Sequence, residues 1–377
     1  MSGINYANTA VELAREAERR KQEIEEMRNI PEDMMQRVKA VGLVRMWAAN
    51  RFNGGQLKVS EVVKILESMA YYNGSIAWVV GVTNCSSLYS GYFPAKLAQS
   101  LFANKMSMVG GFAGPAGVAV IVPGGLKVTG QWSWGSGIRH CTHIVAGVKL
   151  VKDNKFAGTG LVFFHPKEVH LEDNWQVLGL KGTHSINYSA QDVFIPDGRW
   201  SVFPLSTSVI EDPLYRFSPL GALSLSIAAV GLGLAKRAVQ EVVELAKIKQ
   251  PFGQGKPLAQ RAIPQQQTGE LHGNYLAASS LLYQTIAKGE TEALKGKCSA
   301  ETKGAIRLAA CHATTLSLAT VRYAYQLAGG SAIWAESKIQ ELFRDMQVLA
   351  QHGMVNSGNY RTAGSVFLGN EVPESAL

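Results

Sequence analysis

The spacing of apolar residues changes twice along the chain. In the first third they recur at helical intervals with charged residues between them, for example at Ala10, Leu13, Ala17 and Ile24. Over residues 107–196 the pattern becomes short β-rich runs separated by Gly and Pro turns. The helical period returns at Tyr215 and continues to about Phe367. The order is therefore helices, strands, helices.

These periods predict an α+β chain that is mostly helical, in three domains. We expect an N-terminal helical domain at 1–105, a central β-sandwich or barrel of antiparallel strands at 106–212, and a C-terminal helical bundle at 213–377. In the first domain Asn73-Gly74-Ser75 predicts a helix start. In the second, Pro123-Gly124-Gly125 joins two strands as a hairpin. In the third we expect helix breaks near Gly253-Gln254-Gly255, Gly289 and Gly329-Gly330.

Composition narrows the possible classes. Of the 377 residues 46% are hydrophobic and 18% are charged, which excludes a disordered chain. The net charge of +8 divides into +3, 0 and +5 over residues 1–105, 106–214 and 215–377, with no basic block. We therefore expect no nucleic-acid partner.

Cysteine usage and hydropathy indicate a cytoplasmic protein. The four cysteines form no CxxC pair, and the polar N-terminus has no apolar signal core. The stretch 217–235 is uncharged but rich in Gly and Ser, which suits a helix buried among other helices. We therefore expect no membrane span.

Two motifs resemble a dinucleotide-binding loop and a metal site, but each has a simpler structural explanation. GLGLAK at 231–236 follows no strand and has Lys236 where a dinucleotide loop has its third glycine, so packing glycines explain it better. His140 and His143 would face opposite sides of a strand, so we expect no metal site.

An aromatic run, Gly130-Gln-Trp-Ser-Trp-Gly-Ser-Gly137, is more specific. In a regular strand Trp132, Trp134 and Ser136 share one face. A flat aromatic wall with one hydroxyl suits a planar heteroaromatic ligand. The alternative is an aromatic strand packed on the core.

A second candidate lies on the last long helix. Asp345 and His352 are seven residues apart, which places them two turns apart on one helical stripe. A histidine is suited to proton transfer near neutral pH. The alternative is a hydrogen-bonded histidine of the bundle core.

Together these segments resemble the acyl-CoA dehydrogenase superfamily through nearly the whole chain. The similar stretches are GLVRMWAANRFNGG, VLGLKGTHSINYSAQDVFIP, AKIKQPFGQGKPLAQ, and YQLAGG followed by FRD. The resemblance implies a C-terminal four-helix bundle, a flavin between the β-domain and the bundle, and a homotetramer.

The resemblance also implies roles for individual residues. Ser136 matches a hydroxyl that contacts flavin N5, and Trp134 matches a tryptophan beside the ring. The other cofactor-binding positions that it implies are Phe112, Ala113, Lys249, Phe252, Gly329 and Gly330. Lys249 stands where the family motif has arginine. Thr83 and His184 are implied as substrate-lining residues, although some relatives have a histidine near position 83.

A missing carboxylate separates two branches of this superfamily. Acyl-CoA dehydrogenases commonly use a glutamate about nine residues after the Arg of the Arg-Asp pair, but no acidic residue occurs between Asp345 and Glu371. The pattern W-x-W-x-S-G with a histidine after R-D-x6 instead resembles flavin-dependent monooxygenases. Members of that branch form a C4a-hydroperoxyflavin and hydroxylate aromatic substrates. By this resemblance, Ser136 and His352 are the catalytic residues.

We therefore expect a two-component monooxygenase that uses reduced FMN or FAD and O2. Its partner would be an NAD(P)H-dependent flavin reductase that supplies the reduced flavin by diffusion. Its substrate would be a small aromatic or N-heteroaromatic compound, such as an indole-like one. Three alternatives stay open: an acyl-CoA dehydrogenase with an unrecognised base, an amine N-oxidase similar to nitrososynthases, and a flavin-binding scaffold without activity.

Overall fold

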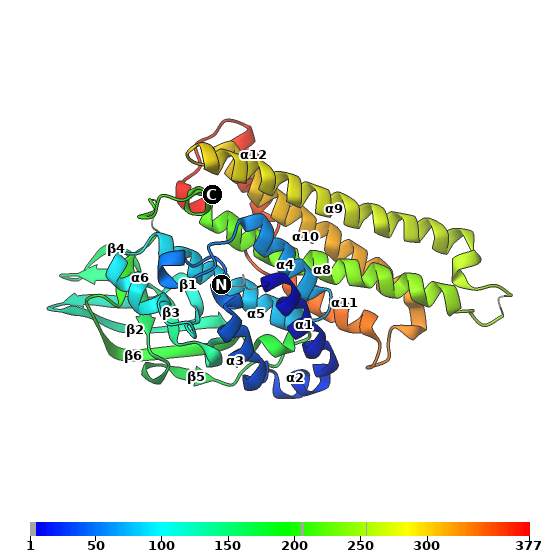
Figure 1. Ribbon diagram of the computed structural model, residues 1–377, viewed down its shortest axis with the longest axis horizontal. Coiled ribbons are helices and arrows are strands. Elements are labelled where there is room, and N and C mark those ends of the chain that lie inside the picture. The colour runs from blue at the N-terminus through cyan, green and yellow to red at the C-terminus, as the bar shows by residue number, and fades with distance from the viewer. Residues whose placement is uncertain (1–4, 205–206, 254) are drawn as a thin grey trace.

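The computed structural model describes residues 5–204, 207–253 and 255–377, and it has the predicted order of helices, strands and helices (Figure 1). Residues 1–4 and 205–206, which fall in the first two predicted domains, lie outside the described residues. The first third forms α1 (Tyr6–Arg19), α2 (Lys21–Met27), α3 (Glu32–Val41), α4 (Val59–Ala70), α5 (Gly74–Leu88) and α6 (Ala95–Phe102).

Helix α5 is the element that connects the parts of the fold. It begins where the sequence predicts, because the Asn73 side chain accepts a hydrogen bond from the Ile76 N–H at 3.1 Å. Its buried residues face all directions, and it contacts both strand β1 and helix α8. A helix buried all round has no charged face, and the sequence of α5 contains no charged residue.

The middle third forms one seven-stranded sheet, whose order is β5-β6-β2-β1-β3-β4-β7. The predicted hairpin is confirmed, since Val122 pairs with Gly125 across the turn. The expectation of purely antiparallel pairing is wrong, because β1 and β3 run parallel. A short connection leads from the end of β2 to β3 on the other side of β1, so β3 runs opposite to β2 and parallel to β1. The strands are β1 (Val109–Val122), β2 (Gly125–Gly135), β3 (His143–Lys152), β4 (Lys155–Phe164), β5 (His170–Glu172), β6 (Ile186–Pro196) and β7 (Trp200–Val202).

The last third is the helical bundle. Its elements are α7 (Pro213–Arg216), α8 (Pro219–Ile248), α9 (Ala262–Lys295), α10 (Ala300–Ala328), α11 (Lys338–Leu349) and α12 (Gly358–Phe367). The breaks at Gly253 and at Gly329-Gly330 are confirmed, and Gln254 lies outside the described residues. The expected break at Gly289 is wrong. Helix α9 continues through this glycine, where a Cβ would lie only 2.6 Å from the Phe217 ring.

Helix α8 is the apolar centre of the bundle. It is long and apolar enough to cross a membrane, but 78% of its most apolar window is buried inside the fold. Its glycines pack against neighbouring helices, as the sequence predicts for GLGLAK. A Cβ on Gly233 would lie 2.3 Å from the Glu67 carbonyl oxygen, so α4 can approach α8 only at a glycine.

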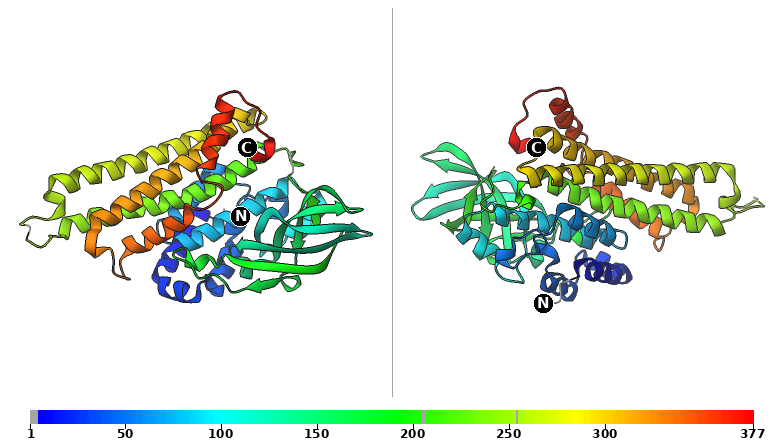
Figure 2. Two further views of the ribbon diagram at one scale, coloured as in Figure 1. Left: turned by 180° about the vertical axis from the view of Figure 1, so that it is seen from behind. Right: turned by 45° about the horizontal axis from the view of Figure 1, so that its top comes forward.

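The two ends of the bundle have different surroundings. The views in Figures 1 and 2 show the sheet packed at one end of the long helices, while the α8–α9 connection extends away from it at the other. Any site between sheet and bundle therefore involves the first turns of α8 and the neighbouring helix α5.

The two strand tryptophans should differ in their effect on stability. Trp132 is 1% exposed and its indole N–H donates to the Gly147 carbonyl at 2.8 Å. Trp132→Phe leaves that buried carbonyl without its donor, so we expect a loss of about 1–3 kcal/mol. Trp134 is 64% exposed, and Trp134→Phe should change stability by less than about 0.5 kcal/mol. Urea unfolding of both variants measures the difference, and equal losses would contradict the assignment.

Candidate active site

Ser136 lies at the centre of a buried group of polar side chains. Its Oγ accepts a hydrogen bond from Trp78 Nε1 at 3.0 Å and lies 2.7 Å from Ser185 Oγ. Ser185 Oγ is in turn 2.7 Å from Thr183 Oγ1. All four side chains are buried. Ser136 is therefore held by α5 on one side and by the segment before β6 on the other.

The expected common face of Trp132, Trp134 and Ser136 is wrong. Trp134 has φ of 62°, and the pairing of β2 with β6 shifts register between Trp132 and Gly135. A positive φ reverses the alternation of side chains. Trp132 consequently stacks on Tyr188 in the core, with ring centroids 5.4 Å apart, whereas Trp134 points into solvent.

Phe112 and Ala113 lie beside this turn on strand β1. The Phe112 ring meets the Trp134 ring edge-on, with centroids 5.9 Å apart. The Phe112 N–H donates to the Tyr188 hydroxyl at 2.8 Å, and Ala113 is exposed within a register shift in the pairing of β1 with β3. Phe112 and Trp134 thus form an accessible aromatic pair near Ser136.

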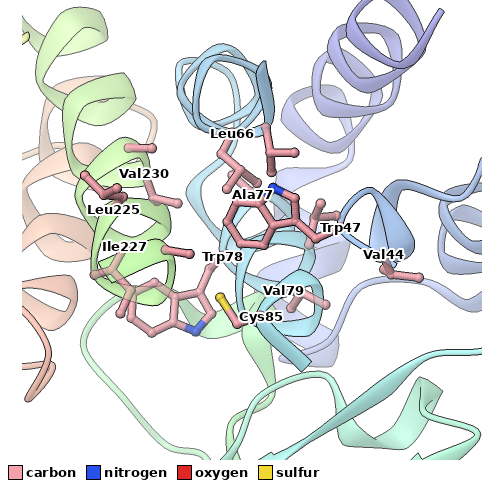
Figure 3. Packing of buried hydrophobic residues seen from close by; sticks show 14 of the residues in the cluster. Val44, Trp47, Leu66, Ala77, Trp78, Val79, Cys85, Leu225, Ile227 and Val230 are labelled. Atoms are coloured by element: carbon pink, nitrogen blue, oxygen red, sulfur yellow. The ribbon is translucent and has the colours of Figure 1, made fainter. Parts of the chain in front are cut away.

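His352 approaches the same region from the bundle. Its ring meets the Trp78 ring edge-on at 5.5 Å, so Trp78 contacts both candidate catalytic residues. Figure 3 shows Trp78 next to Ile227, close to the first turns of α8. His352 Nδ1 accepts a hydrogen bond from the Met354 N–H at 3.2 Å, which leaves the proton of a neutral ring on Nε2.

The proposed stripe of Asp345 and His352 is wrong. Helix α11 ends at Leu349, so His352 lies in the turn that follows. Asp345 Oδ1 instead accepts a hydrogen bond from the Leu180 N–H at 2.6 Å, and burial raises the pKa of its carboxyl to about 7. Asp345 therefore fastens the loop before β6 to the bundle and does not orient His352.

Arg307 was not found from the sequence. This buried guanidinium on α10 donates to Ser224 and Asn359, and it lies 3.6 Å from Met354 Sδ. Asn359 in turn donates to the Gly353 carbonyl at 3.0 Å. Burial, and then the charge of Arg307, lower the pKa of His352 to about 4. Arg307 therefore positions the turn that carries His352 and favours its neutral form.

The two expected substrate-lining residues have different environments. Thr83 is buried and faces Gly110, whose missing Cβ would lie 3.5 Å from its methyl group and 3.6 Å from the Ser136 carbonyl. Both ring nitrogens of His184 are occupied within the protein: Nδ1 lies 2.8 Å from the Arg28 carbonyl, and Nε2 accepts from Arg139 at 3.0 Å. Thr83 is thus close to Ser136, whereas the contacts of His184 are structural.

The remaining predicted cofactor residues form a second group at the far end of the bundle. Lys249 Nζ donates to the Ala328 carbonyl and lies next to Gly329, while Phe252, Gly329 and Gly330 are exposed. Ile227, beside Trp78, lies on α8, and Lys249 follows the last residue of that helix 22 positions later, a rise of about 33 Å. The structure does not bring the two groups together within one chain.

Other potential sites do not compete with this one. Within the described residues, no group of three or more His, Cys, Asp or Glu side chains could hold a metal ion. A cavity of about 590 Å³ lies near the C-terminus and contains none of the predicted site residues. It is lined by Ala300, Val366, Gly369, Asn370, Glu371, Val372 and Pro373.

Comparison with known proteins supports the resemblance read from the sequence. A family model described as the C-terminal domain of acyl-CoA dehydrogenase matches residues 225–357. Indole-3-acetate monooxygenase of Acinetobacter baumannii is 27% identical over 345 residues, which cover 90% of this chain and 88% of the relative. The oxygenase subunit HsaA of a flavin-dependent monooxygenase of Mycobacterium tuberculosis is 24% identical over 367 residues, covering 93% and 91%.

A solved structure gives the same fold. XiaF from Streptomyces sp., in complex with FADH2 and glycerol, superposes with a TM-score of 0.89 at 22% identity, and the match covers 98% of both chains. This likeness confirms the predicted fold of an N-terminal helical part, a central β part and a C-terminal bundle.

The ionisation of His352 gives a direct test of the site. Because its pKa is lowered to about 4, His352 should be neutral at pH 6, and its contribution to stability should be lost as the pH falls from 6.5 toward 4. An NMR titration, with His352→Gln to assign the signal, measures this. Arg307→Met should raise the pKa, though not fully to 6.5, because the burial remains. A wild-type pKa near 6.5 would show that the site is hydrated.

Proposed function

We propose that the chain belongs to the flavin-dependent monooxygenase branch of the acyl-CoA dehydrogenase superfamily, and that it is the oxygenase component of a two-component system. It uses reduced FMN or FAD and O2 to hydroxylate a small aromatic or N-heteroaromatic substrate. The name of the Acinetobacter relative supports an indole-like ring. The observation that carries this proposal is the convergence of Ser136 and His352 on Trp78.

The residues present fit a flavin ring. The Trp134 side chain is exposed to solvent, although its backbone has a strained positive φ. The Phe112 ring packs against it. Such strain is retained where a site requires it. A planar ring would cover this aromatic pair and meet the Ser136 hydroxyl at its edge. Bound reduced flavin would supply the electrons that activate O2 for transfer of one oxygen atom to the substrate.

The polar groups suit oxygenation better than dehydrogenation. Ser136 supplies a hydroxyl that would hydrogen-bond the ring edge, and the Nε2–H of neutral His352 can donate a hydrogen bond to the substrate. Trp78, which contacts both residues, is only 8% exposed, so water has little access to this part of the site. Asp345 is buried and bound to the Leu180 N–H, so it does not serve as the base of a dehydrogenase.

We also propose that each flavin site is completed by a second subunit of a homotetramer. The separation of Ser136 from Lys249, Phe252, Gly329 and Gly330 supports this, because one flavin is too short to reach both groups within a chain. In the tetramer, the end of the bundle that carries Lys249 in one subunit would contact the phosphate end of a flavin. The ring of that flavin would lie against Trp134 of the neighbouring subunit.

The implied partner and compartment follow from the same proposal. A relative named as an oxygenase subunit supports a separate flavin reductase that supplies reduced flavin. All four cysteines are buried and unpaired, which supports a reducing compartment such as the cytoplasm.

The proposal is tested by turnover with a flavin reductase, NAD(P)H, FMN or FAD, and indole-3-acetate among other aromatic compounds. We expect a hydroxylated product that depends on reduced flavin and O2. Formation of an unsaturated acyl-CoA with an artificial electron acceptor, without any hydroxylated aromatic product, would establish the dehydrogenase alternative.

Ser136→Ala should uncouple the reaction. Loss of the hydroxyl removes a hydrogen bond to the ring, so we expect about tenfold less product per flavin oxidised and correspondingly more hydrogen peroxide. Ser87→Ala is the matched control, because Ser87 is equally buried but donates to the Asn84 carbonyl at 2.8 Å. The role assigned to Ser136 is wrong if both variants keep the wild-type coupling.

Mixed subunits test the shared site. Ser136→Ala alone should form about a tenth of the wild-type product, and Lys249→Glu alone should form no more than that. Co-expression should recover about one quarter of wild-type activity, the fraction of sites that random assembly builds from two intact halves. Activity no higher than that of the two separate variants would place both residues in one subunit's site.

A further inference from the structure

Arg307 is a buried cation without a counter-ion in the part of the chain that the structure describes. Its side chain on α10 is 6% exposed, and its Nε–H has no partner there. Its terminal nitrogens meet only neutral groups, namely the Ser224 hydroxyl, the Asn359 amide oxygen, the Leu220 carbonyl and the Met354 sulfur. Burial lowers the pKa of the guanidinium to about 10, and no described carboxylate opposes this effect. At neutral pH the fold therefore contains an uncompensated positive charge, which is unfavourable unless an anion approaches it.

This charge lies close to His352. Arg307 Nη1 is 3.6 Å from Met354 Sδ, and the Met354 N–H donates to His352 Nδ1 at 3.2 Å. Ser224, which Arg307 contacts, lies one turn before Ile227 on α8, and Ile227 borders the candidate site (Figure 3). Arg307 consequently contributes to the lowered pKa of His352.

Burial without a counter-ion does not by itself indicate a ligand. Arg45 is 4% exposed and its Nε–H also lacks a partner among the described residues, but it donates to the Asn53 carbonyl of its own N-terminal segment at 2.9 Å. Arg307 differs from it by having a neighbouring donor that is accessible to a ligand. His352 is half-buried, its Nδ1 is occupied, and no group within the described ranges accepts a hydrogen bond from its Nε2–H.

An N–H donor beside an uncompensated positive charge favours a ligand that accepts hydrogen bonds and is itself negatively charged. A carboxylate meets both conditions at neutral pH, whereas a phenol is uncharged there. We propose that the substrate is an aromatic carboxylic acid, whose carboxylate accepts a hydrogen bond from His352 Nε2–H and is attracted by the charge of Arg307. Because the surroundings are buried, this attraction is effective without direct contact between the carboxylate and the guanidinium. The inference rests on the proposed function, since it names the substrate class of the same site.

The first measurement compares ligands that differ only in charge. Indole-3-acetate and indole-3-acetamide have nearly the same shape, and so do phenylacetate and phenylacetamide. The amide oxygen can still accept a hydrogen bond from His352, but only the carboxylate is attracted by Arg307. We therefore expect the wild-type protein, with reduced FMN or FAD under anaerobic conditions, to bind the acid of at least one pair about tenfold more tightly than its amide.

Substitutions at Arg307 should change the binding of the acid alone. Arg307→Met should weaken the acid about tenfold and the amide less than about twofold, because both ligands need His352 but only the acid needs the charge. Arg307→Lys keeps the charge and should keep a preference for the acid. Arg45→Met is the matched control, since it removes an equally buried guanidinium away from the site and should leave both dissociation constants unchanged.

The pKa of His352 gives a second measurement that needs no variant at Arg307. A bound carboxylate favours the charged imidazolium, so the acid should raise this pKa above the value found with the amide. An NMR titration of the two anaerobic complexes measures it, and equal values in both complexes would contradict a carboxylate next to His352.

Failure of this inference differs from failure of the proposed function. The inference is wrong if wild type binds the acid and the amide of each pair equally, or if Arg307→Met weakens both by the same factor, which would leave Arg307 a structural role alone. Hydroxylation of neutral aromatic compounds without any preference for acids would overturn the inference and leave the proposed function intact. If no member of either pair binds and no aromatic compound is hydroxylated, both are wrong.

Discussion

The geometry of the site depends on the left-handed backbone conformation of Trp134. A bulky residue at a φ of 62° costs on the order of 1–3 kcal/mol, so its surroundings must hold it there. The Ser136 N–H donates to the Trp134 carbonyl at 2.9 Å, and the Gly137 N–H donates to the Thr183 carbonyl at 2.8 Å. Because of this tight turn, the Trp132 side chain points into the core and the Trp134 side chain points into solvent. The turn also directs Ser136 toward α5, which a regular strand would not do.

Helix α5 connects the sheet to the bundle. Its Trp78 donates to Ser136 and packs edge-on against His352, so two residues more than two hundred positions apart share one neighbour. On the bundle side, the hydrogen bonds from Arg307 to Asn359 and from Asn359 to Gly353 hold the turn that carries His352. The site is thus assembled from elements of all three parts of the chain, which share one buried hydrophobic cluster.

The sequence predicted the features that depend on periodicity and turn chemistry. The order of helices and strands, the hairpin after Val122 and the helix start at Asn73 were confirmed because each follows from local preferences. Ser136 and His352 were identified by resemblance, and the structure places both against Trp78. The sequence could not show the positive φ of Trp134 or the end of α11 at Leu349, because tertiary contacts determine both. Trp78 was missed because a helix buried all round gives no amphipathic signal.

The central claim is that this chain transfers an oxygen atom from O2 to an aromatic ring with flavin as the reductant. It is tested most directly by mixing the protein with chemically reduced flavin, an indole-like substrate and ¹⁸O-labelled O2, without a reductase, and analysing the product by mass spectrometry. The account predicts a hydroxylated product in which the new oxygen atom carries the label. Unlabelled hydroxylated product, or oxidation of the flavin to hydrogen peroxide alone with every indole-like compound tried, would contradict it.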